Sequence, residues 1–159
     1  MYRNHSGKLP LATLIAGILC LLVASCSAMN QDETLQQSHY SQGENIFLGR
    51  ESVAAKISGH QESLPPQVAR CINCHAPAQS TSTLRESAPA LSSAWLQQAR
   101  ARRGGPAFAY GKESFCMTLR SGVDPEHVIL NRAMPRFDIS NEQCLALWLY
   151  LTEKHGNAQ

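Results

Sequence analysis

The sequence predicts an all-α domain, and three features of the chain support this fold class. The segment Asn141–Glu153 has an apolar stripe at helical spacing, formed by Cys144, Leu147, Trp148 and Leu151. Helix-capping patterns open this segment and an earlier one near Ser41. No alternation of apolar and polar residues runs long enough to predict a strand of ordinary length. With 159 residues, 43% of them hydrophobic and 16% charged, the chain has the composition of one soluble domain.

The N-terminus departs from this composition. Arg3 and Lys8 precede the stretch 9–24, which contains no charged residue. A basic start followed by an apolar stretch is the pattern of a secretory signal peptide, which we assign to residues 1–25. The stretch is shorter than the about 20 residues that a bilayer-spanning helix requires, so a permanent helical anchor is the less favoured interpretation.

The signal segment ends in Val23-Ala24-Ser25-Cys26, which resembles the lipobox of bacterial lipoproteins. In those proteins the cysteine is acylated and becomes the first residue of the mature chain, so Cys26 is the expected lipidation site. Several acyl chains on one residue would anchor the protein firmly to a membrane. The resemblance implies a location on the periplasmic side of a bacterial membrane, with the outer membrane favoured because Ser27 is not acidic. The alternative is an ordinary signal peptide that is cleaved nearby, for example after Ala28.

Residues 26–40 are polar and show no hydrophobic period, so we expect a flexible tether there and a folded domain over residues 41–159. The formal net charge of +2 comes from Arg3 and Lys8. Once the signal is removed, basic and acidic residues balance, and the chain contains no basic motif of the kind that nucleic-acid-binding proteins use. The sequence therefore does not support nucleic acid as a partner.

The first helix of the domain is predicted to begin at Ser41, because Ser41 and Glu44 form a capping-box pattern. It is expected to span residues 41–50, or to continue through residue 55. Gly43 would allow a second helix to approach closely, and Phe47 would fill the space beside it.

The most informative motif of the chain is Cys71-Ile72-Asn73-Cys74-His75. Two thiols separated by two residues, and followed directly by an imidazole, are the attachment signature of c-type haem. Cys71 and Cys74 would each form a thioether with a porphyrin vinyl group, and His75 would bind the iron from one face. We expect one haem c, because the motif occurs once, and a short helix over residues 67–74, opened by Pro66, to present it.

A redox-active thiol pair and half of a zinc site are the alternatives for this motif. A thioredoxin-like pair is expected within a βαβ pattern, and the surrounding sequence shows none. A zinc site requires a second cysteine pair or a spaced histidine pair, and the remaining cysteines are not arranged in that way. Haem attachment is therefore the favoured interpretation.

The opposite face of the iron needs its own ligand. Removal of the signal leaves the methionines Met29, Met117 and Met134. Met29 lies in the predicted tether, and Met117 lies within a predicted helix, where it would fill the core. Met134 precedes Pro135 in a non-helical stretch, and a rigid loop suits a weak thioether ligand, so we assign Met134. The remaining alternatives are His127 and His60.

Three further helices are predicted after the motif. They are Ala94–Arg102, capped by Ser92 and Ser93; Gly111–Arg120; and Asn141–Glu153, opened by the capping box of Ser140 and Gln143. Three arginines, Arg100, Arg102 and Arg103, cluster at the end of the first of these. We favour a solvated helix end for this cluster over a contact with a haem propionate or a partner protein.

The cysteines of the chain number six and can be accounted for one by one. Cys20 leaves with the signal, Cys26 takes lipid, and the haem motif takes two more. Cys116 and Cys144 remain, in an oxidising compartment. We predict that they form a disulfide, which would stabilise the fold by about 3–4 kcal/mol; the alternative is two separate buried thiols.

Over Gly43–Leu151 the sequence resembles the class I cytochrome c family. The likeness is carried by Gly43 with Phe47, by the haem motif, by Met134-Pro135, and by Leu147-Trp148-Leu149-Tyr150-Leu151. It implies a class I cytochrome c fold, with about four to five helices wrapped around one covalently bound haem. It also implies that the first and last helices cross, with Gly43 and Phe47 against Tyr150, and that His75 and a loop methionine ligate the iron. The long segment Ala76–Gly111 and the added cysteine pair depart from the family pattern.

The resemblance implies a carrier of single electrons whose partners are redox proteins such as a dehydrogenase, an oxidase or another cytochrome. With both axial positions filled, the iron has no room for a substrate, and we expect a non-enzymatic protein that docks briefly through a small interface. A second hypothesis is a haem c enzyme, such as a peroxidase, or a gas sensor, in which the sixth position is open or Met134 leaves on demand. A third is a fixed electron-transfer subunit of a larger complex.

Overall fold

The computed structural model describes residues 33–75 and 88–153. The predicted signal peptide, the lipidation site Cys26 and the start of the predicted tether lie outside the described residues, as does most of the loop after the haem motif. The chain divides into two compact units, Met1–Gln37 and Ser38–Gln159. In the first unit the described residues, 33–37, are helical. No helix among the described residues is both long enough and apolar enough to cross a membrane.

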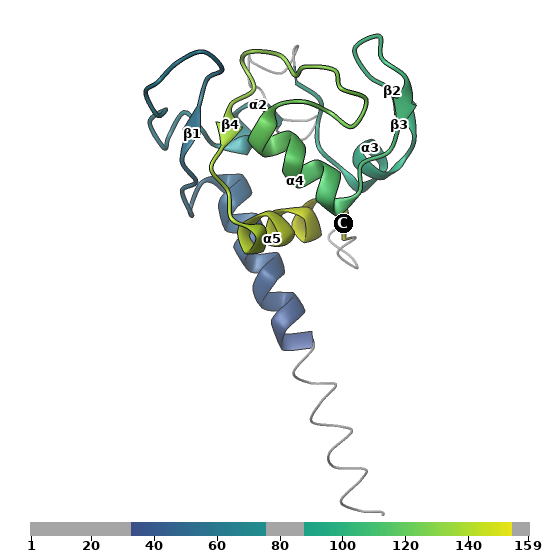
Figure 1. The fold of residues 1–159 in the computed structure, drawn as a ribbon. Helices are drawn as coiled ribbons and strands as arrows, with labels where there is room; N and C mark the ends of the chain where they lie inside the picture. The colour runs from purple at the N-terminus through teal and green to yellow at the C-terminus, as the bar shows by residue number, and fades with distance from the viewer. Residues whose placement is uncertain (1–32, 76–87, 154–159) are drawn as a thin grey trace, which may run out of the picture. The chain divides into compact units, whose positions relative to one another are not determined.

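The described part of the second unit is helix-rich and contains two small sheets (Figure 1). It begins with a helical segment over residues 38–48. The elements that follow are β1 (Ala55–Lys56), α2 (Cys71–His75), α3 (Ser93–Gln97), β2 (Arg100–Ala101), β3 (Ala107–Phe108), α4 (Lys112–Ser121), β4 (Arg136–Phe137) and α5 (Asn141–Thr152). Antiparallel pairing joins β1 to β4, with Ala55 opposite Phe137, and β2 to β3, with Arg100 opposite Phe108.

The caps of α4 and α5 confirm the two long helices that the sequence predicts. Ser140 Oγ accepts a hydrogen bond from the Gln143 amide at 3.0 Å, and Gln143 Oε1 accepts one from the Ser140 amide at 3.1 Å. This reciprocal capping box satisfies amides that the first turn leaves without helical partners. At the end of α4, Gly122 has a φ of 71°, which glycine adopts at little cost, and its amide donates to Thr118 O.

Helical structure starts earlier than the sequence analysis predicts. Residues 33–40, which we expected to form part of a coil tether, are helical, and the backbone is still helical at Ser41, which therefore does not start a helix. Glutamate, leucine and glutamine in this segment are good helix formers, and no glycine or proline interrupts it. Within the second unit, the Tyr40 ring centroid lies 5.1 Å from that of Tyr150, so a packing contact supports helix upstream of the predicted start.

Two middle segments also differ from the prediction. The helix expected over Ala94–Arg102 is limited to α3, because the chain becomes extended at Gln98 and enters β2. The helix expected over residues 67–74 begins only at Cys71, because the amides of Val68 and Ala69 both donate to Pro65 O in a turn. The strands escaped sequence analysis because each is two residues long and shows no period.

The predicted packing of the first helical segment against the last helix is confirmed. A Cβ added at Gly43 would overlap the carbonyl of Ala146 and would lie 2.8 Å from Tyr150 Cβ, so only glycine permits this close approach. The Phe47 ring centroid lies 5.5 Å from that of Tyr150. The helical segment 38–48 and α5 therefore meet backbone to backbone at Gly43, with aromatic rings filling the space beside the contact.

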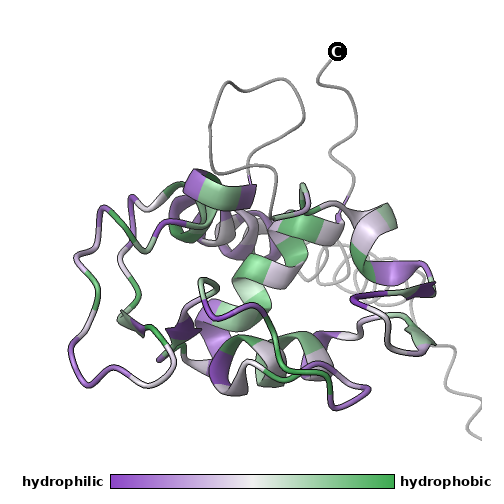
Figure 2. Cartoon of the chain, turned by 90° about the horizontal axis from the view of Figure 1, so that it is seen from above, coloured by the Kyte–Doolittle hydropathy of each residue, from purple (hydrophilic) through white to green (hydrophobic). Residues whose placement is uncertain are grey.

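The hydrophobic core gathers around α4 and α5. The predicted stripe of α5 is buried at all four positions, Cys144, Leu147, Trp148 and Leu151. Phe115 of α4 packs on Trp148 with ring centroids 5.4 Å apart. Figure 2 shows hydrophobic stretches along the helices and hydrophilic stretches at the turns of the outer loops. This core supports the segments that carry the candidate site.

Candidate functional site

Helix α2 places the two thiols and the imidazole of the haem motif on about one helical turn. Cys71 and Cys74 are three residues apart on the helix, so their side chains share a face. The side chain of Asn73 donates to the carbonyls of Gln67 and Val68 at 2.8 and 3.2 Å. Asn73, one of the two residues between the thiols, thus ties α2 to the turn that precedes it, which holds this short helix in place.

His75 is buried, with 9% of its surface exposed, and its two ring nitrogens have different surroundings. Nδ1 lies 2.8 Å from the carbonyl oxygen of Pro89. A carbonyl can only accept a hydrogen bond, so Nδ1 carries the proton and Nε2 carries the free lone pair. Nε2 is buried and has no polar partner among the described residues.

The electrostatics of His75 keep that lone pair available. Burial lowers the pKa of the imidazole, and the hydrogen bond to Pro89 opposes this effect only in part. The ring is therefore neutral at pH 7. A neutral imidazole with one ring nitrogen hydrogen-bonded to a carbonyl, and the other without a polar partner among the described residues, has the arrangement that metal-binding histidines commonly show.

The two cysteines of α2 are free thiols among the described residues. Desolvation raises the pKa of Cys71 to about 12, and the neighbouring Cys74 adds to the rise, while a backbone hydrogen bond opposes it. A redox-active CxxC cysteine depends on a lowered pKa, so the surroundings of Cys71 disfavour that alternative.

Among residues 33–75 and 88–153, no three or more histidine, cysteine, aspartate or glutamate side chains gather as a site for a directly bound metal ion. A small surface pocket borders the motif at Cys71, and its walls include the apolar side chains of Ile46, Leu119, Phe137 and Leu147. Apolar surface therefore lies directly beside one of the two thiols of α2.

Met134 lies in a non-helical stretch, as predicted, and its backbone is held on both sides. Its amide donates to Asn131 O at 2.9 Å, and Asn131 Oδ1 accepts from the Ala133 amide at 2.9 Å. The carbonyl of Met134 accepts from Arg136 Nη1 at 2.6 Å. The side chain is partly buried and packs against the same core cluster as Cys71.

The other candidates for the sixth ligand are less well placed. Met117 is 61% exposed on α4, so the expectation that it fills the core is wrong. His60 and His127 are also exposed. Met29 lies outside the described residues. Met134 is thus the one partly buried candidate among those that the structure describes.

The prediction that Arg100, Arg102 and Arg103 form a solvated helix end is wrong for Arg102, because α3 ends at Gln97 and Arg102 is buried. Arg102 is buried at the end of β2, where its guanidinium carbon lies 4.5 Å from the Phe108 ring centroid and 5.4 Å from that of Trp95. Its Nη1 donates to Phe108 O at 2.6 Å, and its Nη2 donates to Trp95 O. Burial lowers the pKa of this guanidinium. Arg102 therefore ties α3 to the β2–β3 hairpin.

Cys116 of α4 and Cys144 of α5 lie at bonding distance, with an S–S separation of 1.96 Å and a Cα–Cα separation of 5.9 Å. Both residues are buried. The pairing is the one that the cysteine count predicts. It joins the two helices at the centre of the core, beside the ring contact of Phe115 and Trp148.

Three partners of the site escaped sequence analysis, namely Asn73, Pro89 and Arg136. Pro89 contributes a backbone carbonyl, which no side-chain pattern reveals. Asn73 lies inside the motif, but the motif alone does not predict that its side chain donates to the backbone of the turn before α2. For Arg136 the sequence offers a weak signal: it lies two residues after Met134, and an arginine side chain at that separation can reach the Met134 carbonyl.

No family model matches the chain, and neither a curated protein nor a solved structure matches it.

Proposed function

We propose that this protein is a monohaem c-type cytochrome of the class I type that carries single electrons between redox partners. The observation that carries the proposal is His75. It is buried at the end of a helix that holds two free thiols, its Nδ1 bonds Pro89 O, and its Nε2 has no polar partner among the described residues. An orphaned buried nitrogen is costly unless a ligand occupies it.

The donor set fits a covalently attached haem. Cys71 and Cys74 would hold it through thioether bonds, and His75 would donate its Nε2 lone pair to the iron. Pro89 O orients the imidazole and increases its basicity through the Nδ1 hydrogen bond. When bound, the haem supplies a centre that gains and loses one electron. The protein's part is to hold this centre in a low-dielectric core and to exclude substrates from it.

Met134 is the proposed sixth ligand. Its loop is non-helical, its amide and its carbonyl are both hydrogen-bonded, and Pro135 restricts the backbone directly after it. A histidine and methionine pair raises the reduction potential relative to two histidines. With both axial positions filled by side chains, the iron would have no position for a substrate, which favours electron transfer over catalysis.

The partners in this proposal are redox proteins that dock through a small interface, because brief encounters allow rapid turnover. Lipid on Cys26 would hold the domain on the periplasmic side of a bacterial membrane, with the outer membrane favoured. A lipid anchor is compatible both with a free electron shuttle and with a fixed subunit of a larger complex. Purification from solubilised membranes distinguishes these two possibilities. A subunit would co-purify with a dehydrogenase or an oxidase, whereas a shuttle would not.

The test uses the full-length chain, matured in a bacterium that attaches c-type haem. We expect pigment to stay with the polypeptide after extraction with acidified organic solvent. Alanine replacement of either Cys71 or Cys74 should leave one thioether, and the absorption of the haem in alkaline pyridine should shift to longer wavelength. A matched control is the double replacement of Cys116 and Cys144, which should leave the wild-type pyridine spectrum. A colourless protein, or pigment that the solvent extracts, would overturn the proposal.

A further inference from the structure

Arg136 occupies an unusual position at the end of the Met134 loop. It is the first residue of β4 and lies opposite Lys56 of β1 in the sheet register. The amide of Asp138, just beyond β4, donates to Ala54 O at 2.8 Å, so the backbone around Arg136 is held on the sheet. From this fixed point its guanidinium reaches back to the Met134 carbonyl at 2.6 Å.

The guanidinium of Arg136 also covers the end of α4. A Cβ added at Gly122 would overlap the guanidinium atoms of Arg136, and the φ of 71° at Gly122 independently favours glycine. The carbonyl of Gly122 accepts from the Leu130 amide at 2.8 Å. Leu130 and Arg136 therefore both contact Gly122 at the end of α4. These contacts tie the chain on both sides of Met134 to the end of that helix.

Arg136 and Arg103, two arginines near this loop, have different kinds of partner. Arg103 pairs with the buried carboxylate of Asp124 at 3.3 Å. Arg136 forms no ion pair among the described residues, and its one hydrogen bond there goes to Met134 O. The peptide that follows this carbonyl ends in Pro135, which has no amide hydrogen to offer a neighbour. Among the described residues, the half-buried guanidinium of Arg136 thus bonds one acceptor, the backbone carbonyl of Met134.

We propose that Arg136 is a positioning residue for Met134: by bonding the Met134 carbonyl while it covers Gly122, it holds the thioether in place and sets how readily this loop opens. The inference rests on the proposed function, in which Met134 is the sixth ligand of the iron. The backbone carbonyl of Asn131 accepts from the Met134 amide, so Asn131 and Arg136 hold the two peptide groups that flank Met134.

The physical consequence is a shift in the fraction of molecules with an open loop. An exogenous ligand that competes with Met134 binds only the open state, and its apparent affinity scales with that fraction. Loss of a hydrogen bond from a charged donor is expected to raise the open fraction about tenfold. The Met134 amide donates to Asn131 O, so its hydrogen exchanges with solvent only when the loop opens. In a protein without the Arg136 hydrogen bond, this exchange should be faster than in the wild type by a similar factor.

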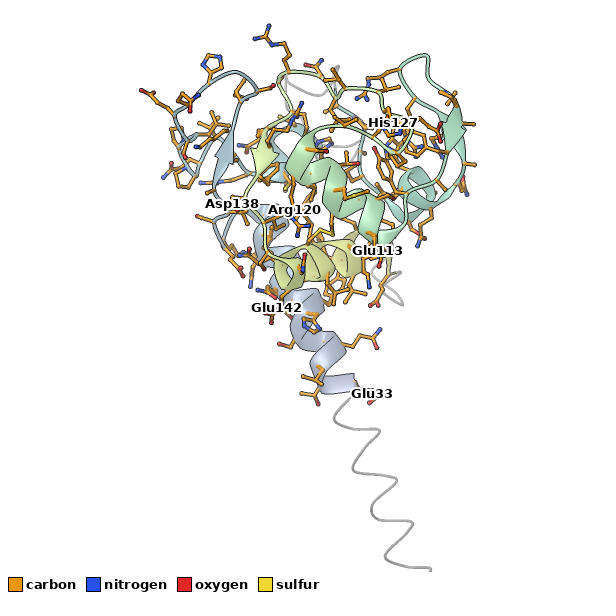
Figure 3. The ribbon with its side chains drawn as sticks, in the orientation of Figure 1. Glu33, Glu113, Arg120, His127, Asp138 and Glu142 are labelled. Atoms are coloured by element: carbon orange, nitrogen blue, oxygen red, sulfur yellow. A yellow bond between two sulfur atoms is a disulfide. The ribbon has the colours of Figure 1, made fainter. Side chains whose placement is uncertain are left out.

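The test compares Arg136→Gln with Arg120→Gln in the matured holoprotein. Arg120, labelled in Figure 3, is a matched control: its Nε donates to Ile139 O at 2.9 Å, and its Nη2 donates to Asn141 Oδ1 at 2.9 Å. It also bonds a backbone carbonyl, but at the start of α5. The probe is imidazole added to the oxidised protein, monitored by the thioether-to-iron absorption band.

We expect imidazole to displace Met134 from the R136Q protein at about tenfold lower concentration than from the wild type, and R120Q to match the wild type. Equal affinity in R136Q and the wild type, or equal increases in both variants, would overturn the inference. If R136Q does not mature, R136M replaces it, because methionine keeps a long side chain but has no hydrogen-bond donor. An imidazole affinity and a Met134 amide exchange rate equal to those of the wild type would then overturn the inference.

Met134→Ala separates failure of this inference from failure of the proposed function. If M134A keeps the wild-type absorption band, Met134 is not a ligand and the proposed axial pair is wrong. If M134A loses the band while R136Q behaves as the wild type, the axial pair stands and only the role of Arg136 is wrong.

Discussion

The carbonyl oxygen of Pro89 lies 2.8 Å from Nδ1 of His75 and so determines which nitrogen of the buried imidazole is free. The two residues are fourteen positions apart in the chain. The contact places the Pro89 carbonyl against Nδ1 and leaves the lone pair of Nε2 on the opposite side of the ring. This arrangement of a buried histidine is the one that metal-binding histidines commonly show, and the proposed role of His75 as an iron ligand rests on it.

Replacement of Gly43 by alanine should destabilise the fold by about 1–3 kcal/mol, because the added Cβ would overlap the Ala146 carbonyl and force the two helices apart. Gly111→Ala is the matched control. A Cβ at Gly111 meets nothing within 4 Å, and its φ is −102°. Urea unfolding of both variants measures the difference. Equal stabilities would contradict the close crossing of the segment 38–48 with α5.

Removal of the Cys116–Cys144 pair by double alanine replacement should lower the free energy of unfolding by about 3–4 kcal/mol, since the link closes a loop of 28 residues. Denaturant titration gives the value. Thiol titration of the denatured mature protein provides the control, because a disulfide leaves no reactive thiol at these positions. Two reactive thiols there would show that the pair is reduced.

Tyr40 should make stability depend on alkaline pH. Burial raises its pKa to about 12, with smaller contributions from Tyr150 and nearby glutamates. An unfolded tyrosine titrates at about pH 10. The folded state therefore holds the phenolic proton more tightly, and this stabilisation is present below about pH 10 and is lost as the pH rises toward 12.

The free energy of unfolding should thus fall over this pH interval, and it should fall less steeply in Tyr40→Phe, which has no proton to lose. Urea unfolding at a series of pH values, followed by circular dichroism, gives both slopes. Identical slopes for the two proteins would mean that Tyr40 is not buried against Tyr150 in solution.

Carbon monoxide distinguishes an electron carrier from an enzyme or gas sensor. We expect the reduced native protein to bind carbon monoxide slowly and incompletely, because in the proposed function Met134 would fill the sixth position. Met134→Ala should bind it rapidly and fully, and Met117→Ala should behave as the wild type, because Met117 is exposed on α4. Flash photolysis and absorption spectra follow the reaction. Rapid, full binding by the native protein would favour the enzyme or sensor.

Local signals in the sequence were sufficient for much of the fold. The caps at Ser140 and Gly122 and the apolar stripe of α5 act within one or two helical turns, so they were visible without the structure. The contact of Gly43 with α5 was expected only through the family resemblance. The helix over residues 33–40 could not be predicted from its pattern, because a mostly polar segment without a hydrophobic period can be either coil or helix.

The parts of the site that escaped prediction depend on tertiary contacts. His75 could be assigned from its motif, but the carbonyl that orients it comes from a loop with no motif of its own. Arg102 has the composition of a solvated residue, and only the folded hairpin encloses it between Trp95 and Phe108. The bond from Arg136 to Met134 O likewise depends on where β4 pairs with β1.

The intact mass of the matured protein tests the central claim most directly. After denaturation in acid, mass spectrometry should find the polypeptide heavier by one haem, and the increment should disappear when Cys71 and Cys74 are both replaced. A polypeptide mass without that increment, from cells that attach haem to a known c-type cytochrome, would contradict the account.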